Sequence, residues 1–311
     1  MTWFWVALAA YLLLAIVNLL DKFLVSTILK NSQAYAFIAC ALGILIWLFA
    51  PWFLVWPGWR LMFWNLINGG IFAAALWLLY EALRRGEAAR TLVFIGGMTP
   101  VFSLIFSVLF FKEQFSSFEW LGISFILSGV FIIAFLPASR SYLTRVFKKL
   151  HLYQDPAVDR LWIALFSALA YSIYFLSTKQ AYAYQPFASA FIWTRLGAGL
   201  FVLLFLLSSS TRRAIVKIFQ PTSPGKHKYL VVINQGLGSL GFILQNYAIF
   251  LGSVVLVNAL QGVQYAFLLI ISAFLAVMAP KLLKESFSWK VLIHKALAVI
   301  VIAAGLYFLA F

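Results

Sequence analysis

The chain has 311 residues, of which 65% are hydrophobic and 10% are charged, with a mean hydropathy of +1.00. This composition excludes a water-soluble globular protein and is typical of a chain that crosses a bilayer several times. The net charge of +15 suggests nucleic acid at first sight, but the basic residues occupy short segments between apolar spans. The positive-inside rule explains that distribution better, so no nucleic-acid partner is expected.

Ten apolar segments approach the length of about 20 residues that crosses the hydrocarbon core of a bilayer. In chain order the first five are Thr2–Leu20, Ala34–Trp56, Leu61–Leu83, Thr91–Phe111 and Phe118–Phe135. The last five are Arg160–Thr178, Phe187–Leu207, Tyr229–Phe250, Val254–Ala279 and Trp289–Ala310. A long polar, basic segment separates the two sets. The sequence therefore predicts a five-helix unit over 1–137, a linker over 138–158 and a second five-helix unit over 159–311.

The stretch from Tyr80 to Phe135 has a distinctive order of features. A charged turn leads into an apolar span that contains Pro100, Glu113 follows that span, and the next span carries Gly122 and Gly129. Gly122 and Gly129 fall on one helix face, where a neighbouring helix can approach closely. This order resembles the signature of the EamA family in the drug/metabolite transporter superfamily. The resemblance implies a polytopic transporter.

The second half repeats the first in weaker form. The motif Lys284-Glu285-Ser286-Phe287-Ser288 matches Lys112-Glu113-Gln114-Phe115-Ser116 in composition and in its place between the fourth and fifth spans. Lys179 closes the sixth span as Lys22 closes the first, and Gly252 follows the eighth span as Gly86 follows the third. No proline matches Pro100; Gln264-Tyr265-Ala266 stand there instead.

Because each unit has five crossings, the second unit enters the membrane upside down relative to the first. The expected fold is an all-α membrane protein with ten transmembrane helices in two inverted five-helix repeats. In such transporters the substrate site lies near the midplane between the halves.

Arg195 is the clearest candidate for a cavity residue. It lies nine residues past Pro186 in an apolar span, so its side chain cannot easily reach the membrane surface. A buried arginine is costly and should face a water-filled cavity or a partner. Holding a helix pair together, or capping carbonyls, is an equally open interpretation. The EamA family often has an arginine here, whereas Cys40 or its neighbours occupy the matching place in the first half.

The eighth and ninth spans are rich in amides, which predicts either a polar cavity wall or hydrogen bonds between helices. The spacing of Asn258, Gln261 and Tyr265 puts all three on one helix face. Tyr171 and Tyr174 share a face of the sixth span, where their hydroxyls either bind a ligand or satisfy interfacial contacts. The full set of predicted substrate-binding residues is Arg195, Lys179, Asn258, Gln261, Gln264, Tyr265, Tyr174, Asn18, Asn65, Asn68 and Gln245.

Acidic residues lie in or beside the predicted loops, so no span carries a central carboxylate. We expect Asp21 and Lys22 to reach the membrane surface from the end of the first span. A cavity with a positive charge and no carboxylate favours a substrate with an anionic group.

The motif Gly236-Leu237-Gly238-Ser239-Leu240-Gly241 fits the dinucleotide fingerprint but lies within an apolar helix, so small-residue helix packing is the expected role. With a single cysteine, Cys40, and isolated histidines, no metal or cofactor is expected.

The sequence thus favours a secondary transporter, an exporter or exchanger of small metabolites such as amino acids, working by alternating access. A lipid or lipid-linked sugar flippase of the same superfamily is the alternative. A membrane enzyme is not expected, because no cluster of acids, bases or metal ligands is evident. Partners are the small-molecule substrate and membrane lipids, a monomer is plausible, and the expected location is the inner (cell) membrane of a prokaryote.

Two arguments about orientation disagree. Loops after odd-numbered spans carry most of the Lys and Arg residues, while the opposite side has far fewer, Arg60 and Lys112 among them. The positive-inside rule then places the odd loops in the cytoplasm and both termini outside. The family resemblance implies cytoplasmic termini. We favour the charge argument, since inversion of the halves leaves the fold itself indifferent to orientation.

Overall fold

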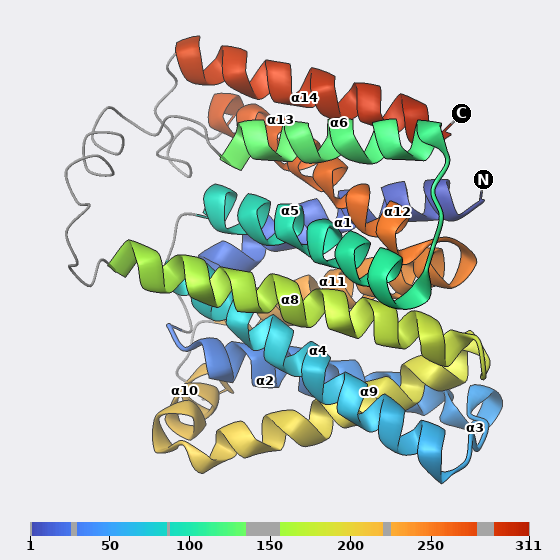
Figure 1. The fold of residues 1–311 in the computed structure, drawn as a ribbon. Coiled ribbons are helices and arrows are strands. Elements are labelled where there is room, and N and C mark those ends of the chain that lie inside the picture. The colour runs from blue at the N-terminus through green and yellow to red at the C-terminus, as the bar shows by residue number, and fades with distance from the viewer. Residues whose placement is uncertain are drawn as a thin grey trace.

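The computed structural model describes residues 2–25, 30–85, 88–134, 156–219, 225–278 and 289–310. All elements within these ranges are helical, which confirms the expected all-α class (Figure 1). The first half contains α1 (Thr2–Phe23), α2 (Ser32–Gly43), the 3-10 segment η2 (Ile44–Phe49), α3 (Ala50–Phe53), α4 (Trp59–Arg85), α5 (Ala88–Phe106), the π-helical turn η3 (Ser107–Phe111) and α6 (Ser117–Ala134). The second half contains α8 (Pro156–Tyr182), α9 (Phe187–Leu203), the 3-10 segment η4 (Leu204–Leu207), α10 (Ser209–Phe219), α11 (Gly225–Leu251), α12 (Val254–Ala259), α13 (Gln261–Met278) and α14 (Trp289–Ala310).

Six helical segments in the described part of the chain are long and apolar enough to cross a membrane. They are Thr2–Asp21, Ser32–Phe53, Trp59–Arg85, Phe94–Phe111, Leu161–Tyr182 and Phe187–Leu207. They match the first four predicted spans and the sixth and seventh. The chain is therefore an integral, multi-pass membrane protein. The remaining predicted spans correspond to α6, α11, the α12–α13 pair and α14, and the count of ten crossings stays a prediction.

Several helix ends have clear local causes. Asn31 caps α2 by accepting a hydrogen bond from the Ala34 amide at 2.9 Å. Ser116 and Glu119 form a capping box at the start of α6, in which each side chain accepts from the other residue's amide. Pro156 begins α8, where its missing amide hydrogen costs nothing. The predicted linker over 138–158 lies outside the described residues as far as 155.

Most of the extensive helix contacts join the two halves of the chain. α6 packs along α14, α1 along α11, α4 along α8 and α9, α2 along α9, and α5 along α12. Figure 1 shows α6 beside α14, with the first turn of α1 and the last turn of α14 at the same end of the bundle. The core is thus shared between the halves.

The contact between α4 and α9 is unusually close. A Cβ added at Gly69 would meet the backbone oxygen of Thr194 at 2.1 Å, and one added at Gly197 would meet that of Leu66 at 2.2 Å. Only glycines allow two helix backbones to approach so closely. Asn65 and Gln185 exchange side-chain hydrogen bonds of 3.1 and 3.2 Å between α4 and the turn before α9. This side of the bundle is therefore tightly closed.

Candidate functional site

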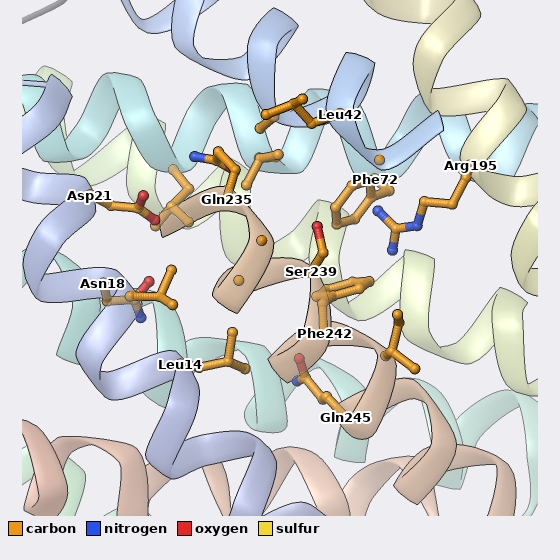
Figure 2. A pocket seen from close by; sticks show the side chains of 18 of the residues that line it. Leu14, Asn18, Asp21, Leu42, Phe72, Arg195, Gln235, Ser239, Phe242 and Gln245 are labelled. Atoms are coloured by element: carbon orange, nitrogen blue, oxygen red, sulfur yellow. The ribbon is translucent and has the colours of Figure 1, made fainter. Parts of the chain in front are cut away.

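A cavity of about 420 Å³ lies between the halves, within the range typical of small-molecule sites. Its wall is mainly apolar, with side chains from α1, α2, η2, α4, α5, α8, α9, α11 and α13. Figure 2 shows part of this wall, with Asp21 and Asn18 on one side and Arg195 on the other. The polar residues that line it are Asn18, Asp21, Tyr80, Thr99, Tyr171, Arg195, Gln235, Ser239, Gln245, Gln261 and Gln264.

Arg195 lines this cavity from α9 and is only 7% exposed. Its guanidinium carbon lies 4.2 Å from the centre of the Phe72 ring and 4.5 Å from those of Phe191 and Phe242. Cation–π attraction to the three rings offsets part of the cost of burying the charge. Its Nε and Nη2 atoms have no hydrogen-bond partner among the described residues. The guanidinium is thus held by aromatic faces and keeps unused donors.

The position of Asp21 is the main difference between the structure and the sequence analysis. It does not reach the membrane surface: it is 3% exposed and lines the cavity from the last part of α1. Its Oδ1 atom accepts hydrogen bonds from the Tyr35 hydroxyl at 2.5 Å and from the Asn234 amide at 2.7 Å. The expectation of a cavity without a carboxylate is therefore wrong. The error arose because Asp21 follows an apolar span, and the sequence alone does not show that α11 and α2 pack around that helix end.

The predicted amides of α11 and α13 lie partly on the wall. Gln245 lines the cavity and donates to the Tyr11 hydroxyl at 3.3 Å. Gln261 and Gln264 also line it, and Gln261 Oε1 and Gln264 Nε2 have no hydrogen-bond partner in the described part of the chain. These two residues follow the break at Leu260 between α12 and α13. A discontinuous helix at a substrate cavity is a recurring feature of secondary transporters.

Several predicted site residues lie elsewhere. Asn258 is fully buried behind the wall and donates to Ser103 at 2.9 Å, so it does not share the cavity with Gln261. The Tyr174 hydroxyl donates to Asn246 at 3.0 Å. Asn65 pairs with Gln185 as described above, and Asn68 donates to Thr178 at 2.6 Å. These residues join helices, which was the other interpretation of buried amides and hydroxyls. The Tyr265 side chain is outside the described part of the structure.

Lys179 caps a helix instead of facing the cavity. Its ammonium group donates to the carbonyl oxygens of Ile249, Phe250 and Gly252, at 2.9, 3.0 and 2.8 Å. These carbonyls lie at the C-terminal end of α11, where the helix dipole also favours a cation. Three acceptors satisfy all three donors of the ammonium group.

The glycines of the motif Gly236–Gly241 in α11 have two different roles. Gly238 and Gly241 face Val17 and Leu14 of α1, at 3.2 and 3.0 Å from an added Cβ, which agrees with the expected helix packing. Gly236 lines the cavity, and an added Cβ would meet nothing within 4 Å. Among the described residues no group of three or more His, Cys, Asp or Glu side chains forms a possible metal site.

The set of binding residues predicted from the sequence omitted Asp21, Phe72 and Gln235, which line the cavity. It also omitted Tyr35, which donates a hydrogen bond to Asp21. A signal was present for Asp21, since it precedes Lys22 as Thr178 precedes Lys179. The matching residue Thr178 is buried in α8. The repeat thus pairs Asp21 with a buried position, but the burial of Thr178 is visible only in the structure.

Comparisons with known proteins agree with this architecture. An uncharacterized transporter, YdfC, of Bacillus subtilis (strain 168) is 31% identical over 110 residues, which cover 34% of this chain and 30% of the relative. An uncharacterized transporter in the cobO 3′ region of Sinorhizobium sp is 38% identical over 66 residues, which cover 21% of this chain and 46% of the relative. The matched part thus spans less than half of either relative.

A solved structure titled only "Crystal structure of protein" matches with a TM-score of 0.59 and 18% identity, over 97% of this chain and 94% of that one. At this identity the match shows the fold alone. Residues 1–135 match the model of the EamA-like transporter family. The match covers the stretch that carries the resemblance seen in the sequence, so the resemblance to this family is confirmed for residues 1–135.

Proposed function

We propose that the chain is a secondary transporter that carries small metabolites with an anionic group, such as amino acids, through the cavity by alternating access. In this proposal ten helices form two inverted repeats, 1–137 and 159–311, joined by the linker 138–158. The relatives named above are transporters by description and come from bacteria, so a prokaryotic inner membrane is the proposed location. No enzymatic activity is part of the proposal.

The helix contacts support the inverted repeat. In the proposed repeat, α1 corresponds to α8 and α4 corresponds to α11. The contact between α1 and α11 is therefore equivalent to the contact between α8 and α4, and both contacts are extensive. Likewise α6 corresponds to α14, α2 to α9, and α5 to the α12–α13 pair. Each of these corresponding pairs is in direct contact, as a two-fold relation between the halves requires. α2 and α9 also both continue into 3-10 segments, η2 and η4.

Two hydrogen bonds repeat in the same way. Asn68 of α4 donates to Thr178 of α8, and Asn234 of α11 donates to Asp21 of α1. The sequence interval from Asn68 to Asn234 equals that from Gly86 to Gly252, and the interval from Asp21 to Thr178 equals that from Lys22 to Lys179. The same intervals that suggested the repeat in the sequence thus also relate these two contacts.

One pair of equivalent contacts departs from the symmetry, which supports alternating access. α4 and α9 meet closely at Gly69 and Gly197, but the equivalent contact between α11 and α2 is slight. The residues equivalent to Gly69 and Gly197 are Gln235 and Leu42, and both line the cavity (Figure 2). A protein with two equivalent interfaces, one closed and one open, has a second state available in which their roles are exchanged.

The observation that carries the substrate class is Arg195, a buried cation with unused donors on the cavity wall. Guanidinium groups bind carboxylates and phosphates with paired, charge-assisted hydrogen bonds. An anionic group of the cargo supplies the acceptors that the protein does not.

The test is uptake of a panel of amino acids into vesicles containing the purified protein, with and without a pH gradient. Arg195→Leu should abolish uptake while insertion and thermal stability are retained, because the aromatic rings also pack around a leucine. Arg195→Lys should keep partial uptake, since it keeps the charge but loses the paired geometry. Full uptake by Arg195→Leu would overturn the anionic-substrate argument.

A lipid flippase remains the second candidate because of one feature of the cavity. Its wall includes Leu45, Leu48 and Phe49 of η2, which are 57, 70 and 51% exposed. Apolar side chains exposed at a cavity rim allow a lipid tail to stay in the bilayer while its headgroup enters. Fluorescent lipid scrambling in the same vesicles separates the candidates: scrambling without amino-acid uptake would favour the flippase.

A further inference from the structure

The cavity contains two opposite charges, and each breaks the internal repeat. Arg195 occupies the position equivalent to Cys40, at the same interval that separates the starts of α2 and α9. Asp21 occupies the position equivalent to Thr178. In the equivalent contact, the Thr178 hydroxyl alone accepts the hydrogen bond that the asparagine of α4 donates. A carboxylate is therefore not needed to make this helix contact, and its burial is costly.

The hydrogen bonds that Asp21 makes with the described residues all fall on one of its two oxygens. Both the Tyr35 hydroxyl and the Asn234 amide bind Oδ1, and within the described residues no hydrogen bond is found for Oδ2. Asp21 lines the cavity, so this second oxygen is the acceptor that a ligand meets. Tyr35 and Asn234 fix the carboxylate in place, as a binding group requires.

Asp21 and Arg195 lie too far apart to pair with each other. Asp21 binds Asn234, and Arg195 lies over Phe242, eight residues further along α11. Eight residues of α-helix correspond to about 12 Å along the axis. Figure 2 shows the two side chains on opposite sides of the pocket, with Ser239 between their levels on α11. Each charge therefore lacks the other as a direct partner.

We infer that the cavity binds a substrate with a cationic amine at one end and an anionic group at the other, with the amine on Asp21 and the anion on Arg195. This inference rests on the proposed function and specifies its substrate class. We take the rise of about 12 Å along α11 as the separation between the Asp21 carboxylate and the Arg195 guanidinium. Subtracting about 3 Å for a charge-assisted hydrogen bond at each end leaves about 6 Å between the two charged groups of the substrate. An extended chain of five bonds spans about that distance.

This spacing distinguishes an ω-amino acid or a short peptide from a simple α-amino acid, whose two charges are only two bonds apart. The cavity wall is mainly apolar, with Leu14, Val17, Leu76 and Phe175 among its residues. It fits a chain of methylene groups.

Three probes with the same five-carbon chain test the inference: 5-aminopentanoate, with the amine at the far end; pentanoate, without an amine; and norvaline, with the amine beside the carboxylate. Binding is measured by thermal stabilisation of the full chain in detergent, and transport by uptake into vesicles. We expect 5-aminopentanoate to bind at least about tenfold more tightly than the other two, because it alone makes a charge-assisted hydrogen bond at each end of the cavity. This ranking on the unmodified protein requires no variant to fold.

Variants assign the two ends. Asp21→Asn keeps an acceptor for Tyr35 and Asn234 and should reduce 5-aminopentanoate binding to the level of pentanoate. Arg195→Leu should remove binding of all three probes. If pentanoate and 5-aminopentanoate bind equally, with Arg195 still required, the inference fails and the proposed function stands. If norvaline binds most tightly, the spacing is wrong. If no probe binds, the proposed substrate class fails together with the inference.

Discussion

Replacing Gly197 by alanine should shift the transporter out of the state seen in the structure. A Cβ at this position would lie 2.2 Å from the Leu66 oxygen and 2.6 Å from its Cα, both backbone atoms of α4. Ordinary contacts need about 3.5 Å, so the two helices must separate by about 1 Å. Overpacking of this kind costs about 1–3 kcal/mol.

That cost falls on the state in which α4 and α9 are in contact. If the second state separates them, as the exchange of equivalent interfaces requires, its population relative to the first rises by a factor of about 5–150. A cysteine at Ser239, which lines the cavity on α11, reports which side of the membrane the cavity faces. The native Cys40 is replaced by alanine first, so that the reporter is the single thiol.

The assay is labelling of this cysteine by a membrane-impermeant thiol reagent, added to either side of vesicles with oriented protein. Gly197→Ala should move labelling from one side to the other. Gly236→Ala is the matched control, because an added Cβ there meets nothing within 4 Å. Equal labelling in the two variants, with equal stability, would refute the close-contact argument. Lower stability without a change of side would mean that the contact serves packing alone.

Further predictions concern a helix cap and the orientation. Lys179→Met should lower the thermal midpoint in detergent by removing a donor shared by three carbonyls, a loss of about 1.5–3 kcal/mol, whereas Arg60→Met at an exposed position should not. Substrate affinity of the folded Lys179→Met protein should be unchanged, because Lys179 lies outside the cavity; a large loss of affinity would contradict this placement. A cysteine introduced beside Phe311 in the Cys40→Ala background should react with an impermeant reagent on intact cells, as the charge bias places both termini outside. Labelling only after permeabilisation would show that the charge argument fails and the family orientation holds.

The sequence predicted the helices well because their signal is local. Apolar length alone located the spans, and the boundary at Pro57-Gly58 follows from turn chemistry, with Gly58 at a positive φ of 84°. Finer features of the helices were not predicted. The 3-10 segment η2 and the break at Leu260 leave no mark in apolar length, because both lie within continuous apolar stretches. α8 begins at Pro156, four residues before the predicted Arg160, because the polar first turn hides the helix start.

The candidate site was harder to predict, since buried amides have two uses that look alike in a sequence. Gln261 lines the cavity and Asn258 joins helices, although both lie in one short apolar stretch. The break at Leu260 changes the helix phase between them, so the i, i+3 spacing no longer puts them on one face. Arg195 was predictable because no helix end is within its reach. Asp21 was not, because a carboxylate at a helix end has an ordinary surface role.

The presence of both charges has an energetic consequence for the cargo. Moving one elementary charge through a membrane potential of 100 mV changes its free energy by about 2.3 kcal/mol. The membrane potential would therefore favour the movement of an anionic cargo in one direction and oppose it in the other. A cargo that also carries an amine for Asp21 has no net charge, so its own movement is not driven or opposed by the potential. When Asp21 is ionised, its charge and that of Arg195 cancel, so the site is neutral as a whole both when it is empty and when a zwitterion fills it. The empty site then carries no net charge, so the membrane potential does not oppose its return to the other side of the membrane.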